Sequence, residues 1–240
     1  GEIELSAGWV RHRCAANWKA LPENDSDGYH LGFVHLALFK TVRSSQYQRV
    51  VGEEQAIKAV VRDWGNGHIE IDWSPGYQRP FEWFGNASDA AVERFVAALE
   101  RRDGPELARR RIMEGPAHAL IFPNLFLGET NVAIVQPVGV EECVHWHTPM
   151  FWRGAPEFNG RLLRMAEAGM GPASFLMPDD LIVAGRNQLG LHARTAPWLL
   201  LGRGLHRETV DAEGRTASHV TDETTNRGFW RHFRTVMTET

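Results

Sequence analysis

The feature that most limits how this chain can fold is a set of strand-like segments that follow one another without a helix between them. These segments are rich in β-branched and aromatic residues and are separated by Pro, Gly and Asn turns. They cover 119–122, 131–138 and 143–151. An earlier pair, 57–62 and 69–73, flanks an Asn66-Gly67 hairpin signal. Strands joined by short turns pair antiparallel, so the sequence predicts an antiparallel sheet.

Helical segments stand outside this group of strands. Apolar residues at helical spacing predict helices bounded by capping residues, Gly or Pro. They are expected from Ser88-Asp89 to Gly104, from Pro105 to Met113, from Phe158 to Met170 and from Asn226 to Met237. Pro178-Asp179-Asp180 is interpreted as an acidic turn that opens a loop rich in Gly and Arg. Strands grouped together with helices at the ends predict an α+β domain and not a doubly wound sheet.

Two histidines and an acidic residue are crowded into one short segment. Asp27, His30 and His35 lie within nine residues of one another. Residues four apart share a helix face better than residues five apart, so we expect a distorted helix over about 22–40, or one that ends between the histidines. Two neutral imidazoles and one carboxylate from elsewhere form the facial triad that holds non-haem Fe(II). The segment therefore predicts an iron site.

Composition argues against two other classes of function. The formal net charge of −4 and the lack of a long Lys/Arg run argue against nucleic-acid binding, and no apolar run is long enough to cross a bilayer. The 43% hydrophobic content, with nine Trp and twelve Phe, supports one core for a single domain over 1–240. Cys14 and Cys143 are expected to be free thiols in a cytoplasmic protein.

Short motifs spread over nearly the whole chain carry a family resemblance. They are Asn17-Trp18-Lys19, Glu23-Asn24, Asp27-x-Tyr29-His30-x4-His35, Phe122-Pro123-Asn124, Gly171-Pro172-Ala173-x-Phe175, Asp179-Asp180 and Arg227-Gly228-Phe229. In this order they resemble the catalytic domain of the α subunit of Rieske-type aromatic-ring-hydroxylating oxygenases, nearest to the naphthalene dioxygenase group. The resemblance implies a helix-grip fold, in which an antiparallel sheet curls around a helix and leaves a deep hydrophobic cavity.

The resemblance also implies a role for each member of the histidine segment. His30, His35 and Asp180 match the iron ligands, with Asp179 as the alternative carboxylate. Asp27 matches the aspartate that accepts a hydrogen bond from a ligand histidine and links the iron to the Rieske cluster of a neighbouring subunit. From the residues alone, the histidines could instead be ordinary buried side chains, Asp27 a helix cap and the acidic pair a solvated turn.

The residues that match the family's substrate pocket are mostly apolar, which suits a flat aromatic ring. They are Leu31, Phe33, Val34, His118, Met170, Phe175 and Leu176. His118 is the polar exception, because it could hydrogen-bond a polar substituent or satisfy a backbone group. Met170 and Leu176 stand where the naphthalene enzymes carry aromatic residues, which argues against naphthalene-like specificity.

The chain does not encode the cluster that serves this family as electron donor. A Rieske [2Fe-2S] centre requires Cys-x-His and Cys-x-x-His, and only the first spacing occurs, at Cys143-Val144-His145. We therefore expect residues 1–240 to be a catalytic domain whose N-terminal Rieske domain is absent from this chain. His145 and His147 point to one side of a predicted strand, as a metal pair would, but no third ligand is evident, so a structural role is favoured.

As a whole, the resemblance implies a terminal oxygenase that adds O2 to an aromatic ring at Fe(II), by cis-dihydroxylation or monohydroxylation. Electrons would come from NADH through a reductase and a ferredoxin to the Rieske cluster, and the full-length protein would be a homotrimer or an α3β3 assembly. Two alternatives stay open. One is a metal-free module of the same fold that binds hydrophobic ligands, and the other is an α-subunit remnant that acts as an interaction partner in a trimer.

Overall fold

The computed structural model describes residues 2–5, 8–41, 58–78, 81, 89–195 and 197–239. Its strands are β1 (Ile3–Glu4), β2 (Val10–Cys14), β3 (Val60–Asp63), β4 (Ile69–Asp72), β5 (Ala119–Ile121), β6 (Leu125–Leu127), β7 (Asn131–Gly139), β8 (Glu142–Pro149), β9 (Phe151–Trp152), β10 (Thr209–Val210) and β11 (Thr216–His219). Its α-helices are α1 (Ala20–Asp25), α2 (Leu31–Val34), α3 (Leu36–Thr41), α5 (Asp89–Asp103), α6 (Pro105–Glu114), α7 (Asn159–Met170), α8 (Met177–Leu191) and α9 (Thr224–Thr238).

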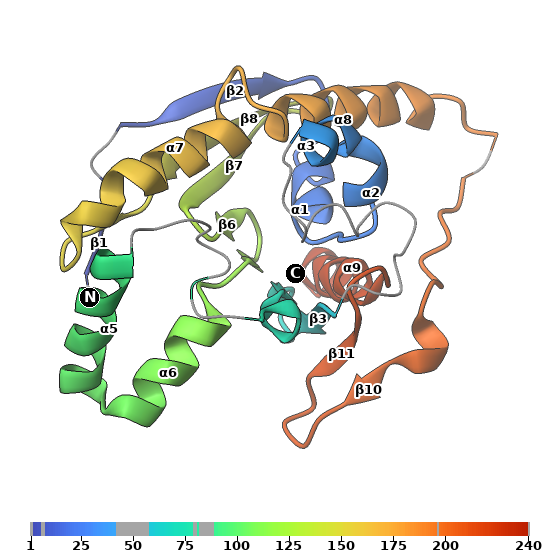
Figure 1. Ribbon diagram of the computed structural model, residues 1–240. Coiled ribbons are helices and arrows are strands. Elements are labelled where there is room, and N and C mark those ends of the chain that lie inside the picture. Colours follow the sequence, from blue (N-terminus) through green and yellow to red (C-terminus); the bar gives the residue numbers. More distant parts are fainter. Residues whose placement is uncertain are drawn as a thin grey trace.

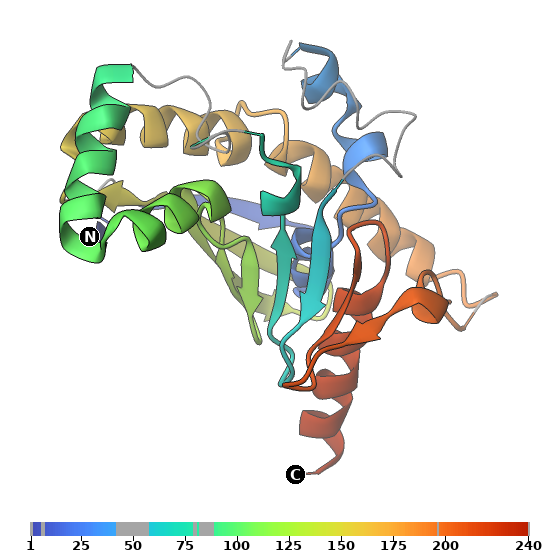
Figure 2. The ribbon, with the colours of Figure 1, turned by 60° about the horizontal axis from the view of Figure 1, so that its bottom comes forward.

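A nine-stranded antiparallel sheet forms the centre of the molecule. Its strand order is β10-β11-β3-β4-β5-β6-β7-β8-β2, so that strands from β3 to β8 lie beside their neighbours in sequence. Helix α9 packs against β3, β4 and β11, whereas α7 packs against β8 and α8 against β2 (Figure 1). Figure 2 shows α5 and α6 at one end of the sheet and α9 at the other. The predicted α+β class and antiparallel sheet are confirmed.

Buried apolar side chains on one face of the sheet hold α9 in place. Ile69 of β4 and Leu120 of β5 lie directly opposite each other and are almost fully buried. Phe229 of α9, which has no exposed surface, packs onto this pair. Burying a side chain of this size contributes roughly 2–3 kcal/mol. The sheet thus closes on α9 through the ring of Phe229, as the helix-grip architecture requires.

The hairpin predicted around Asn66-Gly67 is present between β3 and β4. Gly65, Asn66 and Gly67 all have positive φ angles, which Gly and Asn adopt at the least cost. The two helices predicted on either side of Gly104 are also present, as α5 and α6. Ile57 and Ser88, which were expected to begin the hairpin and to cap α5, lie outside the described residues.

One prediction for the second half of the chain is wrong. Pro178, Asp179 and Asp180 do not form a turn before a loop, because they are the opening of the fifteen-residue helix α8. Proline is well tolerated in the first helical turn, and carboxylates there interact favourably with the positive end of the helix dipole. The expected loop beyond is also shorter than predicted, since β10 and β11 form inside it. Strand β6 was not predicted either.

Among the described helices, none combines the length and the apolar character that crossing a bilayer requires.

Helix α7 offers a direct test of the core. Leu162 has no exposed surface and packs with Phe81, Ile112 and Phe158, whereas the adjacent Leu163 is 38% exposed. We expect Leu162→Ala to lower the free energy of unfolding by about 2–5 kcal/mol, because it leaves a cavity. Leu163→Ala is the matched control and should cost less than about 1 kcal/mol. Urea denaturation followed by circular dichroism measures both; equal losses would contradict the assigned burial.

Candidate metal centre

The short helices α1 and α2 bring the histidine segment between two long helices. Helix α1 contacts both α8 and α9, and α2 contacts α8. His30 directly precedes the four-residue helix α2, and His35 ends it. The segment expected to form a distorted helix over about 22–40, or one that ends between the histidines, is instead divided into α1, α2 and α3, and α2 lies entirely between the two histidines. Ending the helix at His35 lets two residues five apart turn their rings toward each other, which one straight helix does poorly.

His30, His35 and Asp180 meet in the interior. The Nε2 atoms of the two histidines are 3.2 Å apart. Asp180 Oδ1 lies 3.2 Å from His35 Nε2 and 3.7 Å from His30 Nε2. These three residues form the one group of possible ligands in the described part of the chain whose donor atoms all lie within 4.8 Å of one another. The structure thus brings together the two sequence-predicted histidines and the predicted carboxylate.

The donor atoms are buried and poorly satisfied by the protein. His35 is 2% exposed and Asp180 is 7% exposed. Asp180 Oδ1 has no hydrogen-bond partner in the described structure. Burying such an atom without a partner costs free energy, which a cation would recover. Two atoms bound at about 2.1 Å to one ion, at roughly right angles, are about 3 Å apart, close to the separations found here. The three residues therefore fit a metal ion.

Asp180 reaches the histidines because it lies in the first turn of α8, with its side chain on the buried side. Its neighbour Asp179, the alternative ligand, is more exposed and is not part of the group of converging donor atoms. The choice between the two carboxylates that the family resemblance implied agrees with this geometry.

The side chain of Asp27 lies close to both the backbone N–H and the ring of His30. The Asp27 carboxylate accepts hydrogen bonds from the backbone N–H groups of Tyr29, at 2.8 Å, and His30, at 3.3 Å. Its Oδ2 also lies 3.5 Å from His30 Nδ1, at the outer limit of a hydrogen bond. Asp27 is thus a local cap and a partner of the imidazole at the same time. A carboxylate beside Nδ1 favours a proton on that nitrogen, which would leave Nε2 free to face Asp180.

Electrostatics around His30 follow from these contacts. Burial lowers the pKa of His30, but the Asp27 contact and the charge of Asp180 outweigh burial and raise it overall. Burial likewise raises the pKa of Asp27, yet its contacts with His30 bring it below the ordinary range. Asp25, at the end of α1, differs: burial, and next the charge of Asp180, raise the pKa of its carboxyl to about 7. The charge of Asp180 thus acts on both His30 and Asp25.

Helix α9 fixes the position of the segment that carries the histidines. Trp230 Nε1 donates a hydrogen bond to Glu23 Oε1, and Thr225 Oγ1 donates one to the carbonyl of Ser26 at 2.8 Å. Gly28 passes so close to Val220 that an added Cβ would lie 2.3 Å from Val220 Cγ2. A larger residue at position 28 would displace the chain directly before His30. Glu23 was noticed in the sequence as part of a motif, and its partner Trp230 was not.

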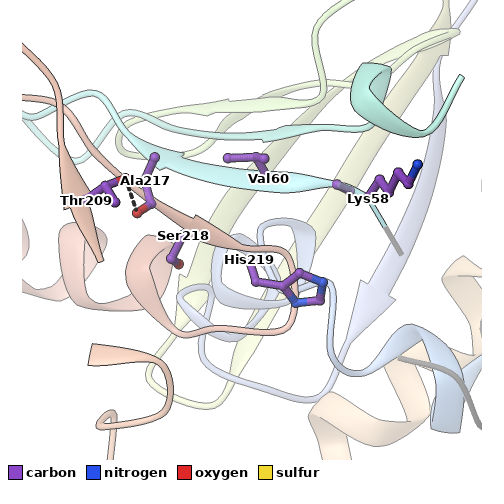
Figure 3. A pocket seen from close by; sticks show the side chains of 7 residues that line it. Lys58, Val60, Thr209, Ala217, Ser218 and His219 are labelled. Atoms are coloured by element: carbon purple, nitrogen blue, oxygen red, sulfur yellow. Dashed lines mark hydrogen bonds between the residues drawn. The ribbon is translucent and has the colours of Figure 1, made fainter. Parts of the chain in front are cut away.

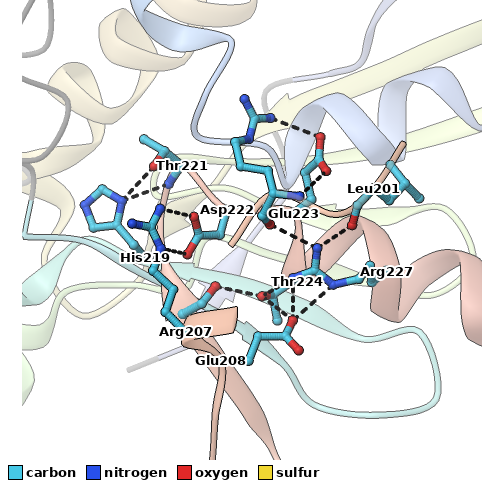
Figure 4. A network of polar contacts seen from close by, with 11 residues as sticks. Leu201, Arg207, Glu208, His219, Thr221, Asp222, Glu223, Thr224 and Arg227 are labelled. Carbon is cyan, nitrogen blue, oxygen red and sulfur yellow. Dashed lines mark hydrogen bonds and ion pairs between the residues drawn. The ribbon is translucent and has the colours of Figure 1, made fainter. Parts of the chain in front are cut away.

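A polar network joins residues 201–208 to the beginning of α9 (Figure 4). Arg227 donates to Glu208 and to the carbonyls of Leu201 and Arg203. Arg203 in turn binds Glu223 at 3.1 Å. Several charge-assisted hydrogen bonds that share partly buried partners hold a loop more firmly than an isolated surface pair does. The network therefore fixes where Arg203 lies.

Arg203 is a residue of the site that sequence analysis missed. Its guanidinium carbon lies 3.6 Å from the centre of the Tyr29 ring, within the range of a cation–π contact. The positive charge also contributes to the lowered pKa of Asp27. No spacing rule connects position 203 with position 29. Only the fold brings the guanidinium beside the segment between Asp27 and His30.

His118 uses both ring nitrogens for contacts inside the protein. Its Nδ1 lies 3.0 Å from Glu129 Oε1, and its Nε2 lies 3.0 Å from the carbonyl oxygen of Asp25. Both partners accept hydrogen bonds, so both nitrogens must donate, and the ring carries a positive charge. The structure thus shows the backbone contact that was one of the two alternatives for His118. A contact with substrate stays a prediction.

The other residues predicted to touch substrate fall into two groups. Leu31 and Val34 of α2, Met170 at the end of α7 and Leu176 before α8 are partly buried. Phe33 and Phe175 are 59% and 49% exposed. A pocket of about 450 Å³ lies elsewhere, between β3 and β11, and is lined by Lys58, Val60, Thr209, Ser218 and His219 among others (Figure 3). None of the predicted residues lines it, so the substrate cavity beside the metal centre stays a prediction.

Comparisons with known proteins agree on one family. A family model described as the ring hydroxylating alpha subunit (catalytic domain) matches residues 4–239. The chain is 26% identical over 216 residues to the 2-halobenzoate 1,2-dioxygenase large subunit of Burkholderia cepacia, covering 85% of this chain and 44% of that protein. It is 24% identical over 228 residues to the anthranilate 1,2-dioxygenase large subunit of Acinetobacter baylyi, covering 87% and 46%.

Solved structures show the same fold. A naphthalene 1,2-dioxygenase with indole bound in its active site has a TM-score of 0.76 at 21% identity, over 98% of this chain and 55% of that one. The Rhodococcus sp. naphthalene 1,2-dioxygenase bound to indole has a TM-score of 0.73 at 20% identity, over 98% and 56%. The helix-grip fold is thereby confirmed. The chain spans about half the length of the curated relatives it matches.

The His118–Glu129 pair predicts a pH-dependent contribution to stability. Burial lowers the pKa of His118, but Glu129 raises it above 6.5 overall; burial raises the pKa of Glu129, but His118 brings it below 4.5. The raised pKa of His118 stabilises the fold below pH 6.5, and this contribution is lost as the pH rises further. The lowered pKa of Glu129 stabilises the fold above pH 4.5. We expect Glu129→Gln to reduce the unfolding free energy by about 2 kcal/mol near pH 5.5. The loss should shrink at pH 9, and a pH-independent loss would contradict the charged pair.

Proposed function

Because the chain belongs to the family of ring hydroxylating alpha subunits, as part of their catalytic domain, we propose that it hydroxylates an aromatic ring at ferrous iron held by His30, His35 and Asp180. The observation that carries this proposal is the convergence of three donor atoms from the partly buried His30 and the buried His35 and Asp180, of which Asp180 Oδ1 has no hydrogen-bond partner in the described structure. Two imidazoles and a carboxylate are the donor set that leaves coordination positions of Fe(II) open.

In this proposal the chain's own residues position the ion and protect the site. His30 and His35 present Nε2, and Asp180 presents Oδ1 from the first turn of α8. Asp27 orients the His30 ring, the backbone N–H of Tyr29 donates a hydrogen bond to Asp27, and Arg203 packs over the ring of Tyr29. When bound, ferrous iron supplies the activation of O2 that ring hydroxylation requires. Burial of His35 and Asp180 keeps water from the ligands.

The proposed substrate is a flat aromatic ring, which receives O2 by cis-dihydroxylation or is monohydroxylated. Leu31, Val34, Met170 and Leu176, with Phe33, His118 and Phe175, are proposed to contact it. The names of the curated relatives, which refer to 2-halobenzoate and anthranilate, support a substituted benzoate as the first class to test. Electrons are proposed to come from NADH through a reductase, a ferredoxin and the Rieske cluster of a full-length trimer or α3β3 assembly, and to enter beside Asp27.

The rival function is a metal-free module that binds hydrophobic ligands in the same fold. Such a module gains nothing from a carboxylate 3.2 Å from a buried imidazole, with an oxygen that no hydrogen bond satisfies. Burying these groups without an ion lowers stability. The donor set therefore favours the oxygenase.

The two acidic residues at the start of α8 give a matched pair of variants. After anaerobic loading with Fe(II) and addition of nitric oxide, we expect the native chain and Asp179→Asn to give an S = 3/2 iron–nitrosyl signal in electron paramagnetic resonance. Asp180→Asn and His30→Ala should lose it, because each removes a ligand. A signal that survives in Asp180→Asn would remove Asp180 from the ligand set, and a signal lost in a folded Asp179→Asn variant would make Asp179 a ligand. Circular dichroism checks that each variant is folded.

The role of Asp27 is tested separately, in the full-length protein. We expect Asp27→Asn to keep iron, since Asp27 contacts His30 on the ring side opposite to the ligand atom. Multiple-turnover hydroxylation should fall by about 10- to 100-fold, because a partner of a ligand histidine is lost. Iron content and product yield are measured on the same sample. Loss of iron from this variant would show that Asp27 is itself a ligand.

A further inference from the structure

Three histidines gather on one buried face of strands β2 and β8, away from the proposed iron site. His12 of β2 lies directly opposite His145 of β8 in the antiparallel register. Directly opposed residues point to the same face of a sheet, and His147, two residues further along β8, points there as well. The sequence showed only the pair on β8. The register supplies the third imidazole, which no sequence spacing could have indicated.

Two of these side chains are buried without satisfying their polar atoms. His145 and His147 have no exposed surface. In the part of the chain that the structure describes, no ring nitrogen of either residue makes a hydrogen bond of good geometry, and the backbone of Met170 is the polar group that acts on His147. A neutral imidazole carries an N–H donor and a lone pair, and both cost free energy when buried unpaired. Four unsatisfied nitrogens in adjacent side chains therefore call for a physical explanation.

The rings surround a common point. The ring centres are 6.2 Å apart for His12 and His145, 5.4 Å for His12 and His147, and 6.0 Å for His145 and His147. A point equidistant from all three lies about 3.4 Å from each ring centre, and a metal bound at about 2.1 Å to an imidazole nitrogen lies about 3.3 Å from the centre of that ring. The ring centres are thus spaced as three imidazoles around one ion would be, although the ring nitrogens do not point to one common position in this structure.

The protonation states also suit metal binding. His12 Nε2 lies 2.8 Å from the carbonyl oxygen of Met170, so Nε2 carries the proton and Nδ1 keeps its lone pair. A backbone carbonyl on the far ring nitrogen is the usual partner of a ligand histidine. Burial, reinforced by the neighbouring rings, lowers the pKa of His145 to about 3 and that of His147 to about 4. Both rings are therefore neutral, as ligands must be.

We propose that His12, His145 and His147 form a second metal site, which binds a divalent transition ion of the Zn(II) class and is independent of the iron site. Three imidazoles with an open fourth position are an established ligand set for Zn(II). The nitrogens of His12, His145 and His147 do not converge as closely as the donors of the iron site do, so binding rotates the rings about their Cβ–Cγ bonds. The ion joins β2, the last strand of the sheet, to β8.

The neighbouring thiols do not belong to this site. Cys14 and Cys143 form the next opposed pair on the same face, and a hydrogen bond joins their side chains. They lie two residues from His12 and His145 along the strands, which is about 7 Å. The proposal therefore specifies nitrogen ligands without sulfur. This distinction can be measured, because sulfur and imidazole scatter X-rays differently around a bound metal.

The test removes the iron site first. Asp180→Asn protein is stripped with a chelator and titrated with Zn(II), and bound metal is measured after dialysis. We expect one ion per chain. Adding His12→Gln should weaken binding by at least about a hundredfold, whereas adding His192→Gln, an exposed histidine paired with Glu141, should change nothing. His12 is only partly buried, so its variant is the one best suited to fold, and circular dichroism verifies this.

X-ray absorption at the zinc edge provides a readout that needs no substitution in the cluster. The Asp180→Asn protein with one Zn(II) should show imidazole scattering and no zinc–sulfur distance. The proposal is overturned if Asp180→Asn protein binds no Zn(II), if His12→Gln leaves the affinity unchanged, or if sulfur appears in the spectrum. Because the background variant lacks Asp180, failure of this proposal and failure of the iron site give different results.

Discussion

The contact between α8 and the segment that carries His30 and His35 is the interaction on which the rest of the site depends. It brings a carboxylate to within 3.2 Å of a buried imidazole, although the two residues are far apart in sequence. Neither group gains from this burial alone, since charged and polar atoms lose hydration there. The arrangement persists because the surrounding elements fix both sides of the contact and because a cation can offset the cost.

The sheet and α9 provide that support through different kinds of contact. Phe229 secures α9 to the sheet through apolar burial, while Trp230 and Thr225 on the same helix bind α1 and the turn after it. Close packing allows little displacement. Helix α9, fixed to the sheet by one face, therefore also fixes the position of the residues that contact its other face. The polar network around Arg227 (Figure 4) also holds Arg203, whose guanidinium packs over the ring of Tyr29. Helix α9 thus fixes the position of the candidate metal centre relative to the sheet.

What could be predicted from the sequence depended on how local each signal is. The hairpin at Asn66-Gly67 and the histidine segment are encoded within a few residues, and both were predicted. Asp180 was selected through a family resemblance, because thirty acidic residues offer no local reason to prefer it. Pro178-Asp179-Asp180 was misread because the residues that begin a helix also favour turns. The contacts of Arg203 with Tyr29 and of His12 with His145 depend on register and tertiary packing, which a linear pattern does not contain.

The brevity of α2 couples local order to occupancy. A helix of four residues cannot persist by itself in water, since a single turn does not recover the entropy of its nucleation. The turn between His30 and His35 is therefore held by its surroundings, and an ion bound there would contribute to keeping it wound. Part of the intrinsic free energy of binding the proposed ion would be consumed in ordering this turn, so the ion would be held less tightly than by a rigid cage of the same donors. Loss of the ion and fraying of the turn become two aspects of one equilibrium.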